Sequence, residues 1–138
     1  MTKIILDKTV VRNDTLPYVI AEIGHNHQGS LEKCKELFLK AKNSGANAVK
    51  LQKRDNKKLY TKDFYNSLYE NRNSYGKTYG EHREKLEFGK KEYDELFQYS
   101  KELGITMFST PFDINSLEFL EQFDCPFYKV ASSDITFL

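Results

Sequence analysis

The feature of this chain that most constrains its fold is the regular recurrence of short apolar runs rich in β-branched residues. Three of them are YVIAEIG (residues 18–24), NAVKLQK (47–53) and ITMFSTPFD (105–113), and a fourth, FYKVASSD (127–134), matches them. None shows the strict alternation of apolar and polar residues that is typical of a half-exposed strand. The pattern therefore predicts strands that are covered on both faces, as in a parallel sheet.

Helical patterns separate these runs. We expect a first helix from the N-cap Ser30 to Gly45, a second that ends before Gly104, and a third that starts near Asp113. Strand and helix thus alternate along the chain. This alternation predicts right-handed βαβ crossovers and an α/β fold.

Two segments stand outside this rhythm. KIILDKTVVRND, near the N-terminus, has two strand-like runs split by Asp7 and Lys8 and predicts a β-hairpin that flanks the sheet. The tract between Lys53 and Gly89 follows the second strand and is rich in Tyr, Asn, Lys and Glu. Long loops in compact domains are usually functional or disordered, and in a barrel this one would lie on the active-site side.

The number of strand and helix units limits the architecture. A complete (β/α)8 barrel needs about 250 residues, whereas this chain has 138. We therefore expect a single domain over residues 1–138 that forms a partial TIM barrel, with about four parallel βα units after the hairpin.

Composition excludes several classes of function. Charged residues make up 30% of the chain but nearly cancel to a formal net charge of +1 without a long run of one sign, which gives no indication of nucleic-acid binding. No apolar stretch is long enough for a signal peptide or a membrane span, so we expect no membrane partner and a cytoplasmic protein. Cys34 and Cys125 lack C-x-x-C spacing and are expected to be reduced packing residues.

Lys50 and Lys129 interrupt apolar strands, two strands apart. A buried ammonium is costly without a partner, so each lysine requires an anion. A structural ion pair with Glu22 and a functional anionic ligand are equally compatible with the spacing. Two lysines at corresponding strand ends favour a shared anionic ligand, and phosphate is the simplest choice.

Other polar residues gather at the expected strand ends, where α/β sheets and barrels bind ligands. Gln52, Thr110 and Ser132 can donate hydrogen bonds there, although each taken singly is more often a loop or capping residue. His25 and His27 form an H-x-H pair that invites a metal interpretation. Two histidines in a loop are more often loop-fixing or substrate-side groups, and a metal would need further ligands.

Taken together, the motifs resemble a known family. IAEIGHNHQGSLEKCKELFLKAKNSGANAVKLQK, YGEHREKLEF, MFSTPFD and KVASSD occur in this order, over roughly residues 17–138. Alone, YGEHREKLEF would be taken for a solvated amphipathic turn. The series closely resembles the N-terminal barrel half of the sialic acid synthase family, that is, of N-acetylneuraminate synthases.

The resemblance implies a transferase reaction in which carbon 3 of phosphoenolpyruvate attacks the aldehyde of an N-acylated amino sugar such as N-acetylmannosamine. Water then adds at carbon 2, and the intermediate loses phosphate to give a nonulosonic acid. By motif, the residues that would bind the phosphate and carboxylate of phosphoenolpyruvate are Lys50, Thr110, Lys129 and Ser132. Glu22 and Gln52 would face the sugar hydroxyls, and Asp134 would handle the attacking water.

This sequence departs from the family pattern in two places. Asp134 stands where the family often has glutamate, and Ser133 stands where many members have glycine. Asp134 has a shorter side chain than glutamate, and both departures suggest a subgroup with a different sugar.

Family members use Mn²⁺ or Mg²⁺ as a Lewis acid. The resemblance implies that the histidine ligands of this metal come from later barrel strands. It also implies that a small antifreeze-like C-terminal domain contributes an arginine to the active site of the other subunit of a homodimer. We expect neither region within the 138 residues, so no metal ligand is assigned here and the isolated chain is expected to be inactive.

Two further hypotheses stay open. A half-barrel without turnover that binds phosphorylated metabolites or pairs with another subunit would also have exposed strand edges that favour self-association. Another phosphoenolpyruvate-condensing barrel, acting on a sugar phosphate, is argued against only by the GHNHQG and YGEHREKLEF segments.

Overall fold

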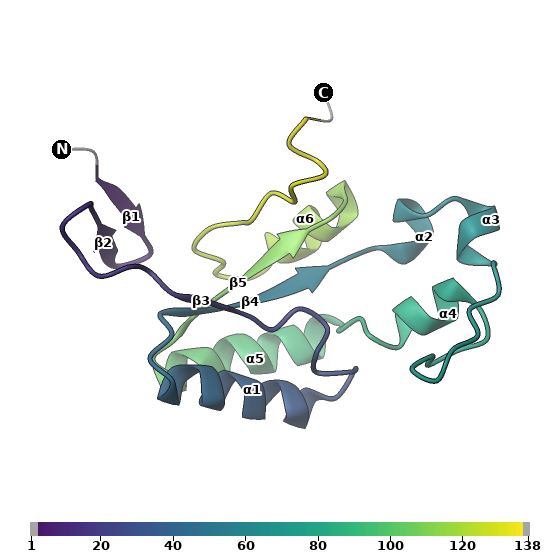
Figure 1. The fold of residues 1–138 in the computed structure, drawn as a ribbon, viewed down its shortest axis with the longest axis horizontal. Coiled ribbons are helices and arrows are strands. Elements are labelled where there is room, and N and C mark those ends of the chain that lie inside the picture. The colour runs from purple at the N-terminus through teal and green to yellow at the C-terminus, as the bar shows by residue number, and fades with distance from the viewer. Residues whose placement is uncertain (1–2, 137–138) are drawn as a thin grey trace.

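The computed structural model describes residues 3–136, and its fold is drawn in Figure 1. In chain order, the elements are β1 (Ile4–Leu6), β2 (Thr9–Val11), β3 (Ile20–Glu22), α1 (Leu31–Asn43), β4 (Ala48–Lys53), α2 (Asn56–Leu59), α3 (Lys62–Tyr65), α4 (Tyr79–Glu84), α5 (Lys90–Leu103), β5 (Thr106–Pro111) and α6 (Ile114–Leu120).

Strands β3, β4 and β5 form one parallel sheet in that order. The first three expected strands are therefore confirmed, although each is shorter than its apolar run. Sequential parallel strands with helices between them are the repeating unit of a parallel α/β barrel, and the chain forms part of one.

The strand expected over residues 127–134 is not formed, and this prediction was wrong. Tyr128 makes one isolated parallel bridge with Ser109, and the Lys129 N–H donates to the Ser109 carbonyl at 3.2 Å. Beyond Ala131 the chain turns. A parallel strand depends on partners and cover on both sides, and the described residues offer this segment only β5.

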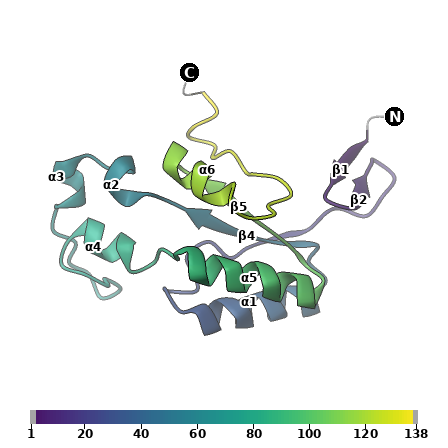
Figure 2. The same cartoon turned by 180° about the vertical axis from the view of Figure 1, so that it is seen from behind.

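Helices α1 and α5 lie side by side against one face of the sheet in both views (Figures 1 and 2). Apolar side chains on that face of β4 and β5 pack with those of the helices, and the buried cluster includes Cys34, Phe38, Val49, Leu51, Tyr93, Leu96 and Met107. Cys34 is thus a packing residue, as expected, and both cysteines are free thiols.

The helices begin and end at the expected capping residues. Ser30 Oγ accepts the Lys33 N–H at 3.2 Å, and Gly104 ends α5 with φ +64°. Asp113 caps α6 by accepting the Ser116 N–H at 2.7 Å, and its other oxygen accepts the Asp55 N–H at 2.8 Å. Asp113 therefore ties α6 to the segment that follows β4.

The hairpin is confirmed, with β1 antiparallel to β2 and Asp7 in its turn at φ +52°. Asp7 Oδ2 accepts a hydrogen bond from Thr106 Oγ1 at 3.0 Å, which joins the hairpin to the start of β5. Figure 1 shows the hairpin at the end of the sheet where the strands begin.

The tract between β4 and α5 is not one structureless loop, because it contains the short helices α2, α3 and α4. These helices lie beyond the end where β4 finishes (Figure 1). Thr78 and Glu81 form a capping box at the start of α4. Within residues 3–136, no helix is both long enough and apolar enough to cross a membrane.

Candidate functional site

The face of the sheet turned away from α1 and α5 carries polar side chains of the three strands. The register places Glu22 opposite Lys50, and Gln52 opposite Thr110. Lys50 forms an ion pair with Glu22, and its ammonium donates to Thr110 Oγ1 at 3.4 Å. The ion pair left open by the sequence is therefore present.

Gln52 reaches the same place from the end of β4. A Cβ added to Gly24 would lie 3.2 Å from Glu22 Oε1 and 3.6 Å from Gln52 Nε2, so both side chains converge beside Gly24. Gly24 has φ +52°, a conformation that favours glycine. The loop after β3 thus comes close to these polar groups because it carries no side chain there.

A cavity of about 370 Å³ lies on this face of the sheet. Its lining residues are Leu6, Ile20, Glu22, Lys50, Phe108, Phe127, Tyr128 and Lys129. Lys50 and Lys129 therefore share a cavity, as the hypothesis of a common ligand requires.

The two lysines differ in burial. The Lys50 side chain is 12% exposed, whereas Lys129 is exposed and its ammonium donates to the Val130 carbonyl. The expectation that both are buried was wrong for Lys129, because the strand that would have buried it is not formed. The Glu22 side chain, in contrast to that of its partner Lys50, is 49% exposed.

Ser132 and Asp134 lie in an exposed turn and are not among the residues that line this cavity. The Asp134 N–H donates to the Ala131 carbonyl at 3.0 Å, and its carboxylate accepts from Ser133 Oγ at 3.0 Å. The structure therefore brings Glu22, Lys50, Gln52 and Thr110 together, adds Lys129 at the rim, and leaves Ser132 and Asp134 outside.

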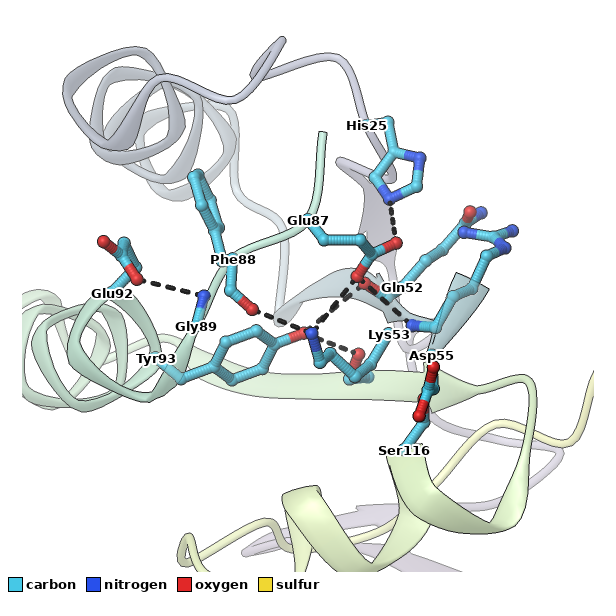
Figure 3. Close-up of polar contacts among 12 residues, drawn as sticks. His25, Gln52, Lys53, Asp55, Glu87, Phe88, Gly89, Glu92, Tyr93 and Ser116 are labelled. Carbon is cyan, nitrogen blue, oxygen red and sulfur yellow. Dashed lines mark hydrogen bonds and ion pairs between the residues drawn. The ribbon is translucent and has the colours of Figure 1, made fainter. Parts of the chain in front are cut away.

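A second polar cluster surrounds the buried carboxylate of Glu87 (Figure 3). His25 Nε2 lies 3.3 Å from Glu87 Oε1, and the Lys53 ammonium lies 3.4 Å from Oε2. Glu87 Oε2 also accepts the Arg54 N–H at 3.2 Å. This carboxylate therefore joins the loop after β3 to the end of β4.

The charges around Glu87 determine its protonation. Burial alone would raise the pKa of Glu87, but His25 and the Lys53 ammonium outweigh it and hold that pKa below its usual value. Glu87 is therefore ionised near neutral pH. Its neighbours are cations or hydrogen-bond donors, so the negative charge of Glu87 is compensated within the cluster.

The histidine pair does not form a metal site. His27 is 2% exposed, stacks on Phe88 with ring centroids 4.1 Å apart, and accepts the Gly29 N–H on Nδ1 at 3.1 Å. Burial, with a smaller contribution from the nearby His25, lowers the pKa of His27 to about 4. Among residues 3–136, no group of three or more His, Cys, Asp or Glu side chains is placed to hold a metal ion.

Sequence reasoning missed the residues around the end of β4. Glu87 lies in the YGEHREKLEF segment, whose amphipathic pattern indicated only a solvated turn. Arg54 and Asn56 follow β4 directly and are 9% and 1% exposed. Their position after a parallel strand was the available signal, but burial of charged residues in a polar tract is not visible in sequence.

Taken together, a parallel sheet with helices on one face and polar residues at its strand ends is the architecture of an α/β-barrel enzyme. The NeuB family model matches residues 37–138, and the chain belongs to this family. The family assignment confirms the resemblance found in the motifs.

Individual relatives agree with this assignment. The chain is 43% identical over 117 residues to N-acetylneuraminate-9-phosphate synthase of Drosophila melanogaster, covering 85% of this chain and 32% of that protein. It is 36% identical over 120 residues to N,N'-diacetyllegionaminic acid synthase of Legionella pneumophila, covering 86% and 34%. The chain thus spans about a third of the length of these relatives.

A solved structure shares the fold. The crystal structure of N-acetylneuraminic acid synthetase from Leptospira borgpetersenii in complex with citrate superposes with a TM-score of 0.76 at 28% identity. The match covers 97% of this chain and 42% of that one. The described fold therefore corresponds to part of a larger synthase.

Proposed function

We propose that this chain is the phosphoenolpyruvate-binding part of a nonulosonic acid synthase, which condenses phosphoenolpyruvate with an N-acylated amino sugar such as N-acetylmannosamine. The observation that carries the proposal is the convergence of Glu22, Lys50, Gln52 and Thr110 on the uncovered face of the sheet in a NeuB family chain. The relatives' names support this reaction class.

Each of these side chains suits one part of the reaction. The ammonium of Lys50 and the hydroxyl of Thr110 are donors for the phosphate of phosphoenolpyruvate, and Lys129 lines the same cavity and would meet the carboxylate. Glu22 would accept hydrogen bonds from the sugar hydroxyls, and Gln52 would accept hydrogen bonds from them or donate to them. On binding, the phosphate would share Lys50 with Glu22.

The chemistry needs no atom beyond the two substrates and water. Carbon 3 of phosphoenolpyruvate forms a bond to the aldehyde carbon, whose oxygen takes up a proton and becomes a hydroxyl. Water adds at carbon 2, and the carbon–oxygen bond to phosphate breaks. Ser132 and Asp134 would take part only if the segment after Ala131 closed over the cavity, where Asp134 would accept a proton from the water.

The described residues do not fit a divalent metal, because they offer no group of three ligands. We propose that any Mn²⁺ or Mg²⁺ is held by residues outside 3–136, and no step here depends on it. We also propose a cytoplasmic protein that forms a homodimer.

The uncovered sheet face gives a reason for association. Ile20 is 42% exposed on this face, and Val130 in the segment above it is 57% exposed. Exposed apolar side chains at an open sheet favour a covering partner. In the proposed enzyme, further barrel strands provide that cover, and without them the chain would pair with another subunit.

The test is an assay of the full-length enzyme that contains this chain, with phosphoenolpyruvate, Mn²⁺ and N-acetylmannosamine or its diacetamido relatives, because the 138-residue chain alone is expected to be inactive. We expect phosphate release together with a nonulosonic acid that mass spectrometry identifies. Lys50→Met should raise the KM for phosphoenolpyruvate, and Lys58→Gln, which removes an exposed lysine from α2, is the matched control. Absence of phosphate release with every sugar would refute the proposal.

A further inference from the structure

Strand β4 continues beyond the end of its neighbour β3. The pairing of the two strands stops at Lys50, whose carbonyl accepts the N–H groups of Ile23 and Gly24 at 3.0 and 3.1 Å. In an extended strand, successive residues direct their N–H and C=O groups to opposite sides, so residues two apart share a side. The Gln52 carbonyl and the Arg54 N–H therefore face the side on which β3 has already ended.

Two side chains take the place of the missing strand there. Glu87 Oε2 accepts the Arg54 N–H at 3.2 Å, and Tyr93 Oη on α5 donates to the Gln52 carbonyl at 3.4 Å. On its other side, β4 stays paired with β5 as far as Lys53. Buried backbone polar groups need partners, and at this end of β4 the partners come from α5 and the segment before it.

Glu87 also holds the loop that follows β3. His25 Nε2 lies 3.3 Å from Glu87 Oε1, and both atoms are buried without a well-aligned hydrogen-bond partner among the described residues, so this contact is what compensates them. Gly24, directly before His25, lies against the side chains of Glu22 and Gln52. One carboxylate therefore supports both the loop and the strand end that meet at these two side chains.

The Glu87 side chain is itself held in place (Figure 3). It is 7% exposed, and the residues on either side of it, Leu86 and Phe88, are 5% and 6% exposed. Phe88 stacks on His27, and its carbonyl accepts the Lys53 ammonium at 2.8 Å, beside the contact of that ammonium with Glu87. A side chain locked in this way can fix the geometry of its neighbours.

The phosphoenolpyruvate side of the proposed site has a different support. Lys50 lies within β4 where β3 pairs with it on one side and β5 on the other, and Thr110 belongs to β5. Gln52 lies past the end of β3, where Glu87 and Tyr93 provide the contacts. Loss of the Glu87 carboxylate should therefore loosen Gln52 and the loop while Lys50 and Thr110 stay in place.

We propose that Glu87 is a positioning residue for the sugar side of the site. It acts through its neighbours, because it orders the loop of residues 24–29 and the end of β4 and thereby fixes Gln52 beside Gly24 and Glu22. This inference rests on the proposed function and adds a residue to it. A displacement of about 1 Å in a group that orients a substrate can lower the rate about 100-fold, so such support matters.

The test is steady-state kinetics of the full-length enzyme that contains this chain, with the sugar that the wild type uses. Glu87→Gln keeps the shape of the side chain but removes the charge that faces His25 and Lys53. We expect it to lower kcat/KM for the sugar about 10- to 100-fold and to change the KM for phosphoenolpyruvate less than about threefold. The matched control Glu36→Gln removes an exposed glutamate of α1 that is paired with Lys40 and should change neither.

His25→Gln is a second variant, because it leaves the contacts of Glu87 with Lys53 and with the Arg54 N–H intact. It should reproduce part of the loss for the sugar and none for phosphoenolpyruvate. A purely structural role of Glu87 would impair the use of both substrates alike. Equal changes for the two substrates in Glu87→Gln, or no change for either, would overturn the inference.

Amide hydrogen exchange tests the positioning without turnover. In Glu87→Gln, the amides of residues 23–29 and of Arg54 should exchange about 10-fold faster than in the wild type, while those of α1 keep their protection. Unchanged exchange at these positions, or a rise throughout the molecule, would overturn the inference. No turnover by the wild type with any sugar would overturn the synthase proposal instead, and hydrogen exchange alone would then decide whether Glu87 orders the loop and the strand end.

Discussion

Glu22 lies directly opposite Lys50 across the parallel β3–β4 pair, and the two side chains form an ion pair at the edge of a cavity. Their exposures differ, because the Lys50 side chain is 12% exposed and that of Glu22 is 49% exposed. Water can therefore solvate the carboxylate more easily than the ammonium. Because of this difference in exposure, the loss of Glu22 and the loss of Lys50 should affect stability differently.

Removal of either partner should have unequal effects on stability. Glu22→Gln leaves the less exposed ammonium without its counter-charge and should lower the free energy of unfolding by about 1–3 kcal/mol. Lys50→Met leaves a carboxylate that water can reach and should cost less. Urea denaturation of both variants measures the difference, and an equal loss in the two would contradict the asymmetry.

Lys129 should matter for ligand binding rather than for folding. Its side chain is exposed and its ammonium donates to the Val130 carbonyl, so Lys129→Ala should change the free energy of unfolding by no more than about 0.5 kcal/mol. In the full-length enzyme, the same variant should raise the KM for phosphoenolpyruvate. Steady-state kinetics measures this effect, and unchanged KM and kcat would remove Lys129 from the site.

The buried His27 should make the fold sensitive to mild acid. Its pKa is about 4 in the folded chain and about 6.5 when unfolded. Between these values the unfolded chain binds a proton that the folded chain does not, so stability is present above the unfolded pKa and falls as the pH drops toward 4. At about pH 5 the loss from this residue should be about 2 kcal/mol.

The measurement is the difference in free energy of unfolding between about pH 7.5 and about pH 5 for the wild type and His27→Gln. The variant should lose less stability across this interval. Glutamate and aspartate titrate mainly below it, so they contribute little to the comparison. An identical loss of stability in both proteins would show that protonation of His27 does not contribute to the destabilisation in acid.

Gly29 should tolerate alanine less well than Gly45 does. Both have a positive φ, +76° and +84°, so alanine strains the backbone at each by about 1 kcal/mol. At Gly29 the added Cβ would also collide with the Lys85 carbonyl, whereas at Gly45 nothing lies within 4 Å. Thermal unfolding should therefore show a larger drop in Tm for Gly29→Ala, and equal drops would argue against tight packing of this loop on the segment after α4.

The amino-acid sequence by itself determined the order of the local elements. Apolar runs, helical stripes and the caps at Ser30, Gly104 and Asp113 are local properties, and the structure confirms the caps, the helices and the first three of the four runs as strands. The family was also visible in sequence, because its motifs combine glycines and polar residues at fixed spacings. The pairing of Glu22 with Lys50 was one of two alternatives that spacing alone left open.

Only the tertiary structure decided which polar groups meet. Ser132 and Asp134 remain outside the cavity because, within residues 3–136, the segment before them pairs with β5 alone and through a single bridge, and strand formation depends on partners distant in sequence. The burial of Arg54 and Asn56 likewise arises from packing between the end of β4 and the segments after it. Burial and charge compensation are sums over such distant contacts, which no local pattern encodes.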